Sequence, residues 1–282
     1  QMALKDYIKR LCKKPINFSN MNRLNKIWKT LTLFAVIMGG FQSCSEDAAA
    51  TGDEILTEAN LQTILSTDDI AGAADNVLAE LFANNETEKS AKANNDCSSA
   101  EYSDTGFVAT FNNCLLNGTE NVNGTLTVIY EAGNETAAFT ATYEDFYVGN
   151  IKINGTRSFE LSTSSEQNTI SFTVVSEMSV EMEDGSIISE NGTKTFSFTF
   201  GDSLENSTFS LSGTWQVEAD GNTYTVTTVD DLQGDLGCEH LTTGSMNVTK
   251  NGLMVVVNFG NGECDDDATL TYPDGTVQDI KL

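Results

Sequence analysis

From Cys97 to the C-terminus, apolar and polar residues alternate with a period of two in short runs rich in Thr, Val, Phe and Tyr. Runs such as "NIKINGTRSFEL" and "TISFTVVSEMSVEM" are separated by Asn-Gly, Asp-Gly or Gly-Asn pairs. Turn residues at intervals of about 8 to 12 positions indicate an antiparallel all-β domain. We therefore predict a meander over residues 96–282 that forms a sandwich or a partly open barrel.

Glycine recurs in this region before Thr or Ser, at intervals too irregular for a repeat protein. We expect these glycines to lie near the starts of strands in the meander. They are Gly124, Gly155, Gly192, Gly213 and Gly244.

A different pattern precedes the strands: from Asp53 to Asn95 it is helical, most clearly in the segment "STDDIAGAADNVLAELF". Its apolar residues recur every three or four positions, which predicts one face of a helix; they are Ile70, Ala74, Val77, Leu78, Leu81 and Phe82. We expect Ser66 or Thr67 to cap the helix start, with Asp68 and Asp69 beside it. The apolar face should pack on the sheet. Residues 44–95 are thus predicted to form an acidic tether and one or two short helices, with a polar linker over 84–96.

Charge divides the chain at Cys44. Eight of the 15 Lys and Arg residues, but only Asp6 of the 41 Asp and Glu residues, lie before it, which leaves a formal charge of −33 on residues 45–282. A body this acidic repels phosphate backbones, so we expect no nucleic-acid partner.

The segment before Cys44 has the layout of a signal peptide. Basic residues at Arg23, Lys26 and Lys29 precede an apolar stretch that is too short for the roughly 20 residues of a spanning helix. Residues 21–43 resemble a bacterial lipoprotein signal, which implies that Cys44 is acylated. An ordinary secretory peptide with a plain Cys44 thiol is the alternative. We interpret residues 1–20 as an upstream extension.

The sequence after Cys44, "SEDAAATGDE", resembles the acidic export signal of Bacteroidetes surface lipoproteins. This resemblance implies a lipid anchor in the outer membrane, with the body facing the cell exterior.

Four further cysteines remain, an even number in a chain predicted to be exported. If Lys250, Asn251 and Gly252 form a three-residue loop, Thr249 faces Leu253, and Cys238 and Cys264 have the same index sum of 502. A two-residue turn at Thr105 and Gly106 likewise makes Cys97 face Cys114. We predict these two disulfides. A zinc site is disfavoured because no Cys-x-x-Cys spacing occurs.

Three stretches carry a resemblance to a family. They are "FVATFNNC", "YVGNIKINGTRSFEL" and "MVVVNFGNGECDDDATLTYPDGTVQDIKL". Together they resemble an uncharacterised, flavobacterial-type family of Bacteroidetes outer-membrane lipoproteins with paired-cysteine β-hairpins, over most of residues 97–282. The chain departs from the family pattern at Asn112 and Asn113, where glycine is usual, and lacks an Arg-Trp segment around Trp215. The resemblance implies an exported all-β lipoprotein and no established activity.

Candidate chemistry is sparse. His240 is the single histidine and is expected in a strand. A lone histidine in a strand does not indicate a catalytic triad of nucleophile, histidine and acid. Asp265, Asp266 and Asp267 offer oxygen ligands for calcium but lack the alternate spacing of known loops, so a solvated turn is favoured. Trp215 could be an exposed glycan platform or a core residue. Acidic residues in the predicted strands, such as Glu181 and Glu183, alternate with apolar residues and are therefore expected on the solvent-exposed face.

These patterns predict a lipid-anchored binding or structural module without a catalytic constellation, metal or cofactor. The membrane is the expected partner through the lipid, and a glycan or an outer-membrane protein is the expected partner of the body. One alternative is a carboxylate-dependent glycan hydrolase, which an exposed Trp215 between two carboxylates would favour. The other is an accessory subunit of an outer-membrane complex, which an undocked helix over Ile70 to Phe82 would favour.

Overall fold

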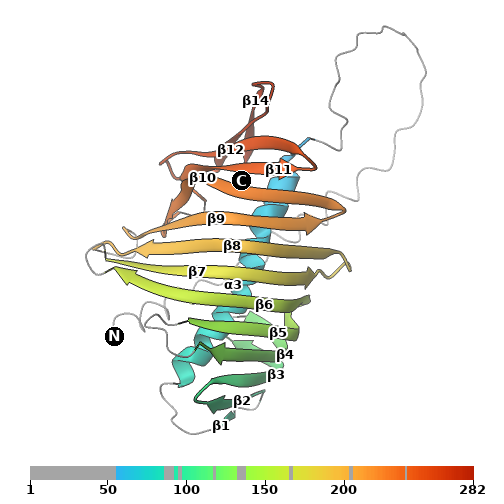
Figure 1. Ribbon diagram of the computed structural model, residues 1–282, viewed down its shortest axis with the longest axis vertical. Helices are drawn as coiled ribbons and strands as arrows, with labels where there is room; N and C mark the ends of the chain where they lie inside the picture. The colour runs from blue at the N-terminus through green and yellow to red at the C-terminus, as the bar shows by residue number, and fades with distance from the viewer. Residues whose placement is uncertain are drawn as a thin grey trace, which may run out of the picture. The chain divides into compact units, whose positions relative to one another are not determined.

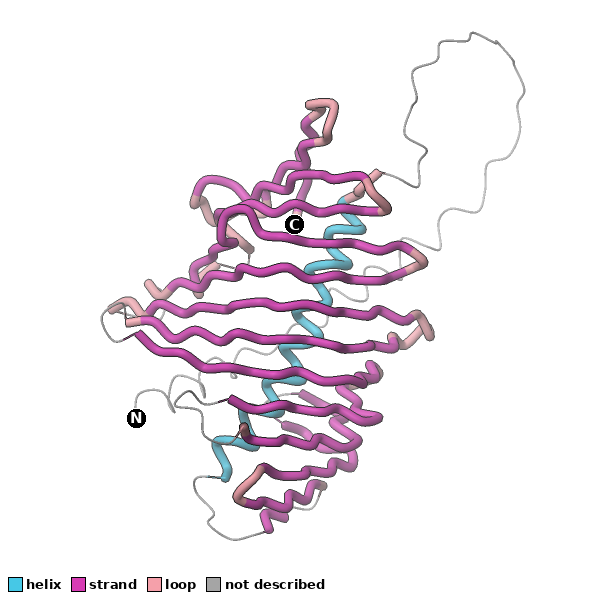
Figure 2. The backbone as a smooth tube through the Cα atoms, viewed as in Figure 1, coloured by secondary structure: helices cyan, strands magenta, loops and turns pink. Residues whose placement is uncertain are grey.

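A computed structural model describes residues 55–85, 92–94, 97–116, 119–131, 138–164, 168–202, 206–238 and 240–282. They belong to one compact unit, Glu54–Leu282, in which one helix lies against a single sheet (Figure 1). The predicted antiparallel all-β meander is confirmed, since every strand pairs with its neighbours in chain order. The sheet is open, and a helix takes the place that a second sheet would have in a sandwich (Figure 2).

The described part of the chain forms fourteen strands in this sheet. The first seven are β1 (Lys92–Asn94), β2 (Ser98–Ser103), β3 (Gly106–Leu116), β4 (Thr119–Tyr130), β5 (Ala138–Val148), β6 (Ile151–Ser164) and β7 (Thr169–Glu181). The others are β8 (Ile187–Thr199), β9 (Thr208–Ala219), β10 (Asn222–Asp235), β11 (Thr243–Lys250), β12 (Leu253–Asn261), β13 (Asp267–Thr271) and β14 (Val277–Lys281). Strand β1 lies inside the segment that the sequence predicted to be a polar linker.

Helix α3 (Glu58–Asn85) lies within the helical pattern predicted over Asp53 to Asn95, but it begins before the predicted cap. The Thr57 hydroxyl accepts a hydrogen bond from the Asn60 amide at 3.2 Å, and the Asn60 side chain accepts one from the Thr57 amide at 3.1 Å. This reciprocal cap satisfies amides that a helix start leaves unpaired. The predicted cap at Ser66 or Thr67 is therefore wrong: both hydroxyls donate to the Thr63 carbonyl within the helix.

The helix packs on one face of the sheet, as predicted, and its apolar side chains join the sheet's core cluster. The Tyr272 hydroxyl donates to the Leu56 carbonyl just before the helix, and the Tyr102 hydroxyl donates to the Leu81 carbonyl near its end. Strands β2 and β13 would lie about 53 Å apart in a flat sheet, whereas this stretch of helix spans roughly 37 Å. The sheet therefore curls toward the helix (Figure 2).

Four of the five recurrent glycines lie within strands rather than at strand starts, which corrects that expectation. They have positive φ angles between 99° and 153°, a conformation that residues with a Cβ rarely adopt. At Gly192 an added Cβ would also lie 2.5 Å from the Cβ of Trp215 on the neighbouring strand. These glycines therefore allow bends and close contacts between strands, and they do not mark strand starts.

Both predicted disulfides are present, but neither hairpin has the predicted register. In β11–β12 the turn contains only Asn251 and Gly252, with φ angles of 49° and 95°, so Thr249 pairs with Met254. Asn-Gly favours this two-residue turn because both central residues need positive φ. Cys238 and Cys264 lie in the flanking loops, with their Cα atoms 5.7 Å apart.

The first hairpin also turns one residue earlier than predicted, at Asp104 and Thr105, because Ser103 pairs with Gly106. The Cys97 carbonyl accepts a hydrogen bond from the Asn112 amide, and Asn113 then adopts a φ of 54° where the strand register shifts. This irregularity brings Cys114 to Cys97, at a Cα separation of 5.3 Å.

Candidate functional site

The face of the sheet that points away from α3, which we call the outer face, is rich in hydroxyl groups. Because side chains alternate along each strand, paired strands align their outward residues in rows. One such row runs across β4 to β10 and contains Ile129, Thr140, Ser158, Val175, Thr193, Thr214 and Thr227. These residues are exposed or half-buried. The outer face is thus a broad, regular and polar surface.

Neighbouring hydroxyls on the outer face bond to one another. Ser171 and Ser197 lie 2.7 Å apart, Thr140 and Ser158 2.8 Å apart, and Thr169 and Thr199 3.0 Å apart, measured between side-chain oxygens. Exposed carboxylates are interspersed among them; they include Glu101, Glu144, Glu160, Glu177, Glu181 and Glu218. The face therefore offers many hydrogen-bond donors and acceptors in a negative field.

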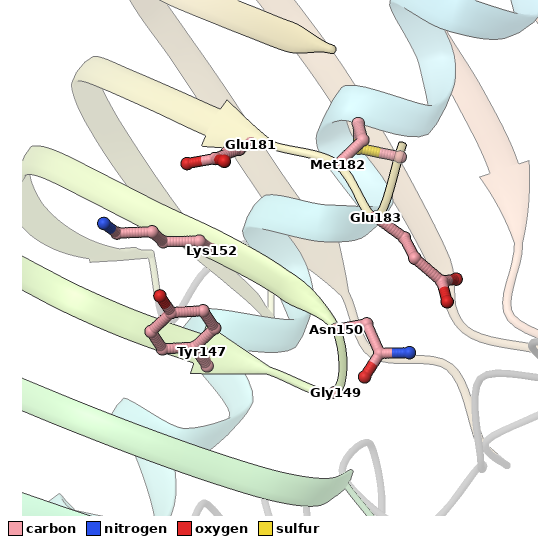
Figure 3. A pocket seen from close by; sticks show the side chains of 7 residues that line it. All are labelled: Tyr147, Gly149, Asn150, Lys152, Glu181, Met182 and Glu183. Carbon is pink, nitrogen blue, oxygen red and sulfur yellow. The ribbon is translucent and has the colours of Figure 1, made fainter. Parts of the chain in front are cut away.

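A shallow pocket of about 320 Å³ lies beside the outer face, at the β5–β6 and β7–β8 hairpin turns (Figure 3). Its lining is polar with one aromatic ring: Tyr147, Gly149, Asn150, Lys152, Glu181, Met182 and Glu183. Lys152 pairs across the strands with both Tyr147 and Glu181. Its ammonium group lies 5.9 Å from the centre of the Tyr147 ring.

Lys152 is held in place by Asp145, whose carboxylate lies 2.6 Å from its ammonium group. This hydrogen bond raises the pKa of Lys152, so the pocket keeps its positive charge at neutral pH. The pocket combines an aromatic ring, an ammonium group, an amide and two carboxylates. Such a set can bind a small polar ligand that has an apolar face.

On the opposite, inner face, four charged side chains lie between α3 and the middle of the sheet. Arg157 is 1% exposed and donates from Nη1 to Asp75 of the helix at 2.5 Å and from Nε to Ser176 at 3.2 Å. Lys194, also 1% exposed, lies 2.7 Å from the Glu190 carboxylate. We call Asp75, Arg157, Glu190 and Lys194 the buried charge cluster.

Two aromatic residues border this cluster. The Lys194 ammonium lies 4.6 Å from the centre of the Trp215 ring, and Trp215 is 1% exposed. Tyr143 is equally buried, and burial followed by the nearby Asp75 charge raises its pKa well above the ordinary value. Charges taken out of water need such close partners, since desolvation costs several kcal/mol per ion.

Two buried polar atoms beside the cluster, Glu190 Oε1 and Trp215 Nε1, have no hydrogen-bond partner among the described residues. Asp75 Oδ1 and the Tyr143 hydroxyl are enclosed together, and a hydrogen bond between the two side chains contributes to the pKa of each. The Asp75 side chain as a whole keeps 31% exposure, although its Oδ1 atom is enclosed. Burial raises the pKa of Asp75, and the Glu190 charge adds to this effect, while Arg157 opposes it. The cluster is thus neutral overall but incompletely satisfied.

The sequence-predicted site residues are dispersed. Cys44 lies outside the described residues. Trp215 is a core residue, so it does not provide the exposed platform that would favour a glycan hydrolase. His240 lies in the half-buried loop between β10 and β11, not in a strand, because the Cys238 bridge ends the strand pairing there. The docked helix likewise does not favour the accessory-subunit alternative.

The acidic run near the C-terminus pairs with a lysine. The Lys281 ammonium lies 2.6 Å from Asp266 and 2.5 Å from Asp267, and the Asp265 carboxylate accepts a hydrogen bond from the Asp267 amide. Among the described residues, no group of three or more His, Cys, Asp or Glu side chains is placed to hold a metal ion.

Sequence reasoning missed the buried charge cluster, although a signal was present. In β6 Arg157 has the same strand phase as the buried Ile153 and Phe159, and in β8 Glu190 and Lys194 share the phase of Ile188. Charged residues at the apolar positions of an alternating pattern indicate buried pairs. Their partner on α3 is 82 residues away from Arg157 in sequence, so only the fold identifies it.

Comparisons with protein families, curated proteins and solved structures yield no match to this chain. Within the described part of the chain, no helix has both the length and the apolar character needed to cross a membrane.

Proposed function

We propose that this protein is an exported binding module, anchored to the outer membrane by acyl chains on Cys44, and that its outer face and adjoining pocket bind a glycan. The outer face carries the proposal. Its in-register Thr and Ser hydroxyls and interspersed glutamates match the hydrogen-bonding capacity of a polyhydroxylated chain. The ring of Tyr147 beside Lys152 adds an apolar surface of the size of one sugar ring.

Export is supported by the two disulfides, because such bonds persist in oxidising compartments. The tripartite segment before Cys44 supports a lipid anchor. Several acyl chains hold a protein to a membrane, whereas a free thiol does not, since each buried methylene contributes about 0.8 kcal/mol. Cys44→Ala should therefore release the protein from the membrane fraction, and continued sedimentation of that variant with membranes would contradict the anchor.

A screen against neutral and acidic polysaccharides tests binding and catalysis together. We expect retention on at least one polysaccharide without release of reducing ends. Tyr147→Ala should weaken retention while leaving the unfolding midpoint unchanged, because this ring is half-exposed. Hydrolysis that a single carboxylate-to-amide change abolishes would favour the hydrolase instead, and binding to an outer-membrane protein alone would replace the glycan as partner.

A further inference from the structure

The outer face carries a second long row of residues, parallel to the row through Thr193 and Thr214. It runs from Val108 on β3 to Met254 on β12, and its consecutive members are pairing partners on neighbouring strands. None of its residues is buried. We call it the threonine row, because half of its members are threonines: Thr127, Thr142, Thr156, Thr225 and Thr249.

The two rows form a regular array of hydrogen-bonding groups. Neighbouring strands lie about 4.8 Å apart, and residues two positions apart on one strand lie about 6.8 Å apart. The threonine row crosses ten strands, β3 to β12, and therefore extends over roughly 43 Å along the sheet. Each threonine presents a methyl group beside a hydroxyl, and a sugar ring presents C–H and O–H groups in similarly close alternation.

Hydrogen bonds within the layer hold several outer hydroxyls in place. Thr140 and Ser158 lie 2.8 Å apart, measured between side-chain oxygens, and Thr214 donates to Thr227 at 3.4 Å. A hydroxyl has one donor and two acceptor positions, so a group that is bonded to a neighbour keeps capacity for a ligand. Side chains that are already ordered also lose less conformational entropy on binding.

The charge of the outer face selects among glycans. Residues 97–282 contain 28 Asp and Glu residues but five Lys and Arg residues. Of these five, Arg157, Lys194 and Lys250 are buried on the inner side. The other two, Lys152 and Lys281, form ion pairs with aspartates. A ligand on the outer face lies within about 8 Å of exposed glutamates, where salt screens little of their repulsion. An acidic glycan is therefore disfavoured.

The shape of the sheet restricts the ligand further. Because the sheet curls toward α3, its outer face is convex (Figure 2). A rigid, flat crystalline surface would contact only part of a convex row. A single chain with rotatable linkages can follow the whole row.

We propose that the glycan bound by the outer face is one neutral, linear chain that lies across the strands, between the threonine row and the row through Thr193 and Thr214; this rests on the proposed function and specifies the charge, form and direction of the ligand. A sugar unit of an extended chain is about as long as one strand spacing, so about ten units cover the threonine row. Once the first units are bound, the contacts of each further unit are intramolecular, so affinity rises with chain length.

Chain length gives the first test. The full chain is titrated with oligosaccharides of about 2 to about 12 units from cellulose, xylan and mannan, lengths that bracket the ten strands of the row. We expect the affinity for at least one series to rise about tenfold or more between about 4 and about 10 units and then to level off. Oligogalacturonates of the same lengths should bind more weakly.

The outcomes separate this inference from the function on which it rests. Equal affinity for short and long neutral fractions, or tighter binding of oligogalacturonates, would overturn the inference while leaving glycan binding intact. Failure of every polysaccharide and oligosaccharide to bind would refute the proposed function, and the inference with it.

Two matched double variants test the direction of the bound chain. Thr142→Val with Thr249→Val removes hydroxyls from β5 and β11, six strands apart in the threonine row. This change should weaken binding of fractions of about 10 units about tenfold and leave binding of fractions of about 4 units nearly unchanged. The control, Thr173→Val with Thr195→Val, removes two paired hydroxyls of the same face that lie outside both rows. All four side chains are half-buried, so the unfolding midpoint should stay unchanged in both variants. Loss of long-chain binding in the control variant alone would overturn the proposed direction.

Discussion

The two faces of this sheet are built from the same strands but differ in what they contain. In β8 the inward positions hold Ile188, Glu190 and Lys194, all buried, while the intervening outward positions hold polar residues such as Asn191 and Thr193. The inner face combines aliphatic packing with the buried charge cluster. The outer face repeats small hydroxyl residues over many strands.

The two faces differ in how much a single position contributes to the stability of the fold. A core position has partners on all sides, so its replacement leaves a cavity or an unpaired charge. An outward Thr or Ser has neighbours within its own layer and water beyond, so its replacement changes little in the fold. The same strands can therefore combine an inner face that tolerates few substitutions with an outer face that tolerates many.

The largest expected effect is on the inner face at Trp215. Trp215→Ala removes a fully buried ring that contacts Lys194 and adjoins Gly192, so the unfolding free energy should fall by about 3 to 5 kcal/mol. The neighbouring outward change, Thr214→Ala, should cost no more than about 0.5 kcal/mol. Urea unfolding measures both, and equal losses would contradict the division between the faces.

Buried and exposed ion pairs should respond differently. Lys194→Met leaves the Glu190 carboxylate buried without its partner and should cost about 3 kcal/mol or more, most of which Glu190→Leu in the same chain should restore. In the outer pair, the side chains of Lys152 and Asp145 are 26% and 75% exposed. Lys152→Met should therefore leave the denaturant midpoint nearly unchanged. Denaturant midpoints of the three variants decide the point.

The disulfides add stability at the ends of the strands and belong to neither face of the sheet. The bridge from Cys238 to Cys264 closes a loop with a sequence separation of 26, and replacing both cysteines by Ser should cost about 3 kcal/mol. Non-reducing peptide mapping of the parent chain should recover this pair and the pair of Cys97 and Cys114. A peptide that joins Cys238 or Cys264 to Cys97 or Cys114 would contradict the observed connectivity.

A smaller effect distinguishes the inner carboxylate from the outer ones. Because burial raises the folded-state pKa of Asp75, stability relative to Asp75→Asn should decline as the pH rises through that pKa. Asp184 behaves oppositely: its hydrogen bonds to Ser186 lower its pKa, so its contribution is lost as the pH falls. Unfolding free energies of Asp75→Asn and Asp184→Asn across the acid range should diverge from the parent in opposite directions.

The smallest effect is expected from removing outer hydroxyls without changing shape. Thr193→Val, Thr214→Val and Thr227→Val together keep the β-branched surface of one row. The unfolding free energy should change by no more than about 0.5 kcal/mol for each substitution. Thermal unfolding of the triple variant checks this, and a fall of several kcal/mol would mean that the hydroxyl row stabilises the fold.

The alternation of apolar and polar residues was sufficient to predict the strands, because successive side chains of a strand point to opposite faces of the sheet. The disulfide partners were also predicted, although Asn251 and Gly252 form a tighter turn than the one assumed. Register depends on turn type, and one residue of error there moves every pair in the hairpin. The bridges tolerate this error because Cys238 and Cys264 lie in loops beyond the ladder.

The buried charge cluster and the helix start lay beyond local reasoning. Asp75 reaches Arg157 only because α3 crosses β6, and no spacing in the sequence encodes that crossing. The true cap at Thr57 lies nine residues before the predicted cap at Ser66, although the helical pattern was predicted from Asp53 onward. Glu190 also breaks the rule that acids in these strands face solvent, since it is 2% exposed.

The proposed binding role of the outer face is tested most directly by measuring glycan retention and unfolding on the same samples. We compare the parent chain with the triple valine variant of the outer row, Thr193, Thr214 and Thr227, and with Lys194→Met of the inner face. We expect the outer variant to lose retention with an unchanged unfolding midpoint. The inner variant should keep retention, under conditions where it remains folded, with a lowered midpoint. Full retention by the outer variant, or loss of retention only in proportion to lost stability, would contradict a binding role for the outer face.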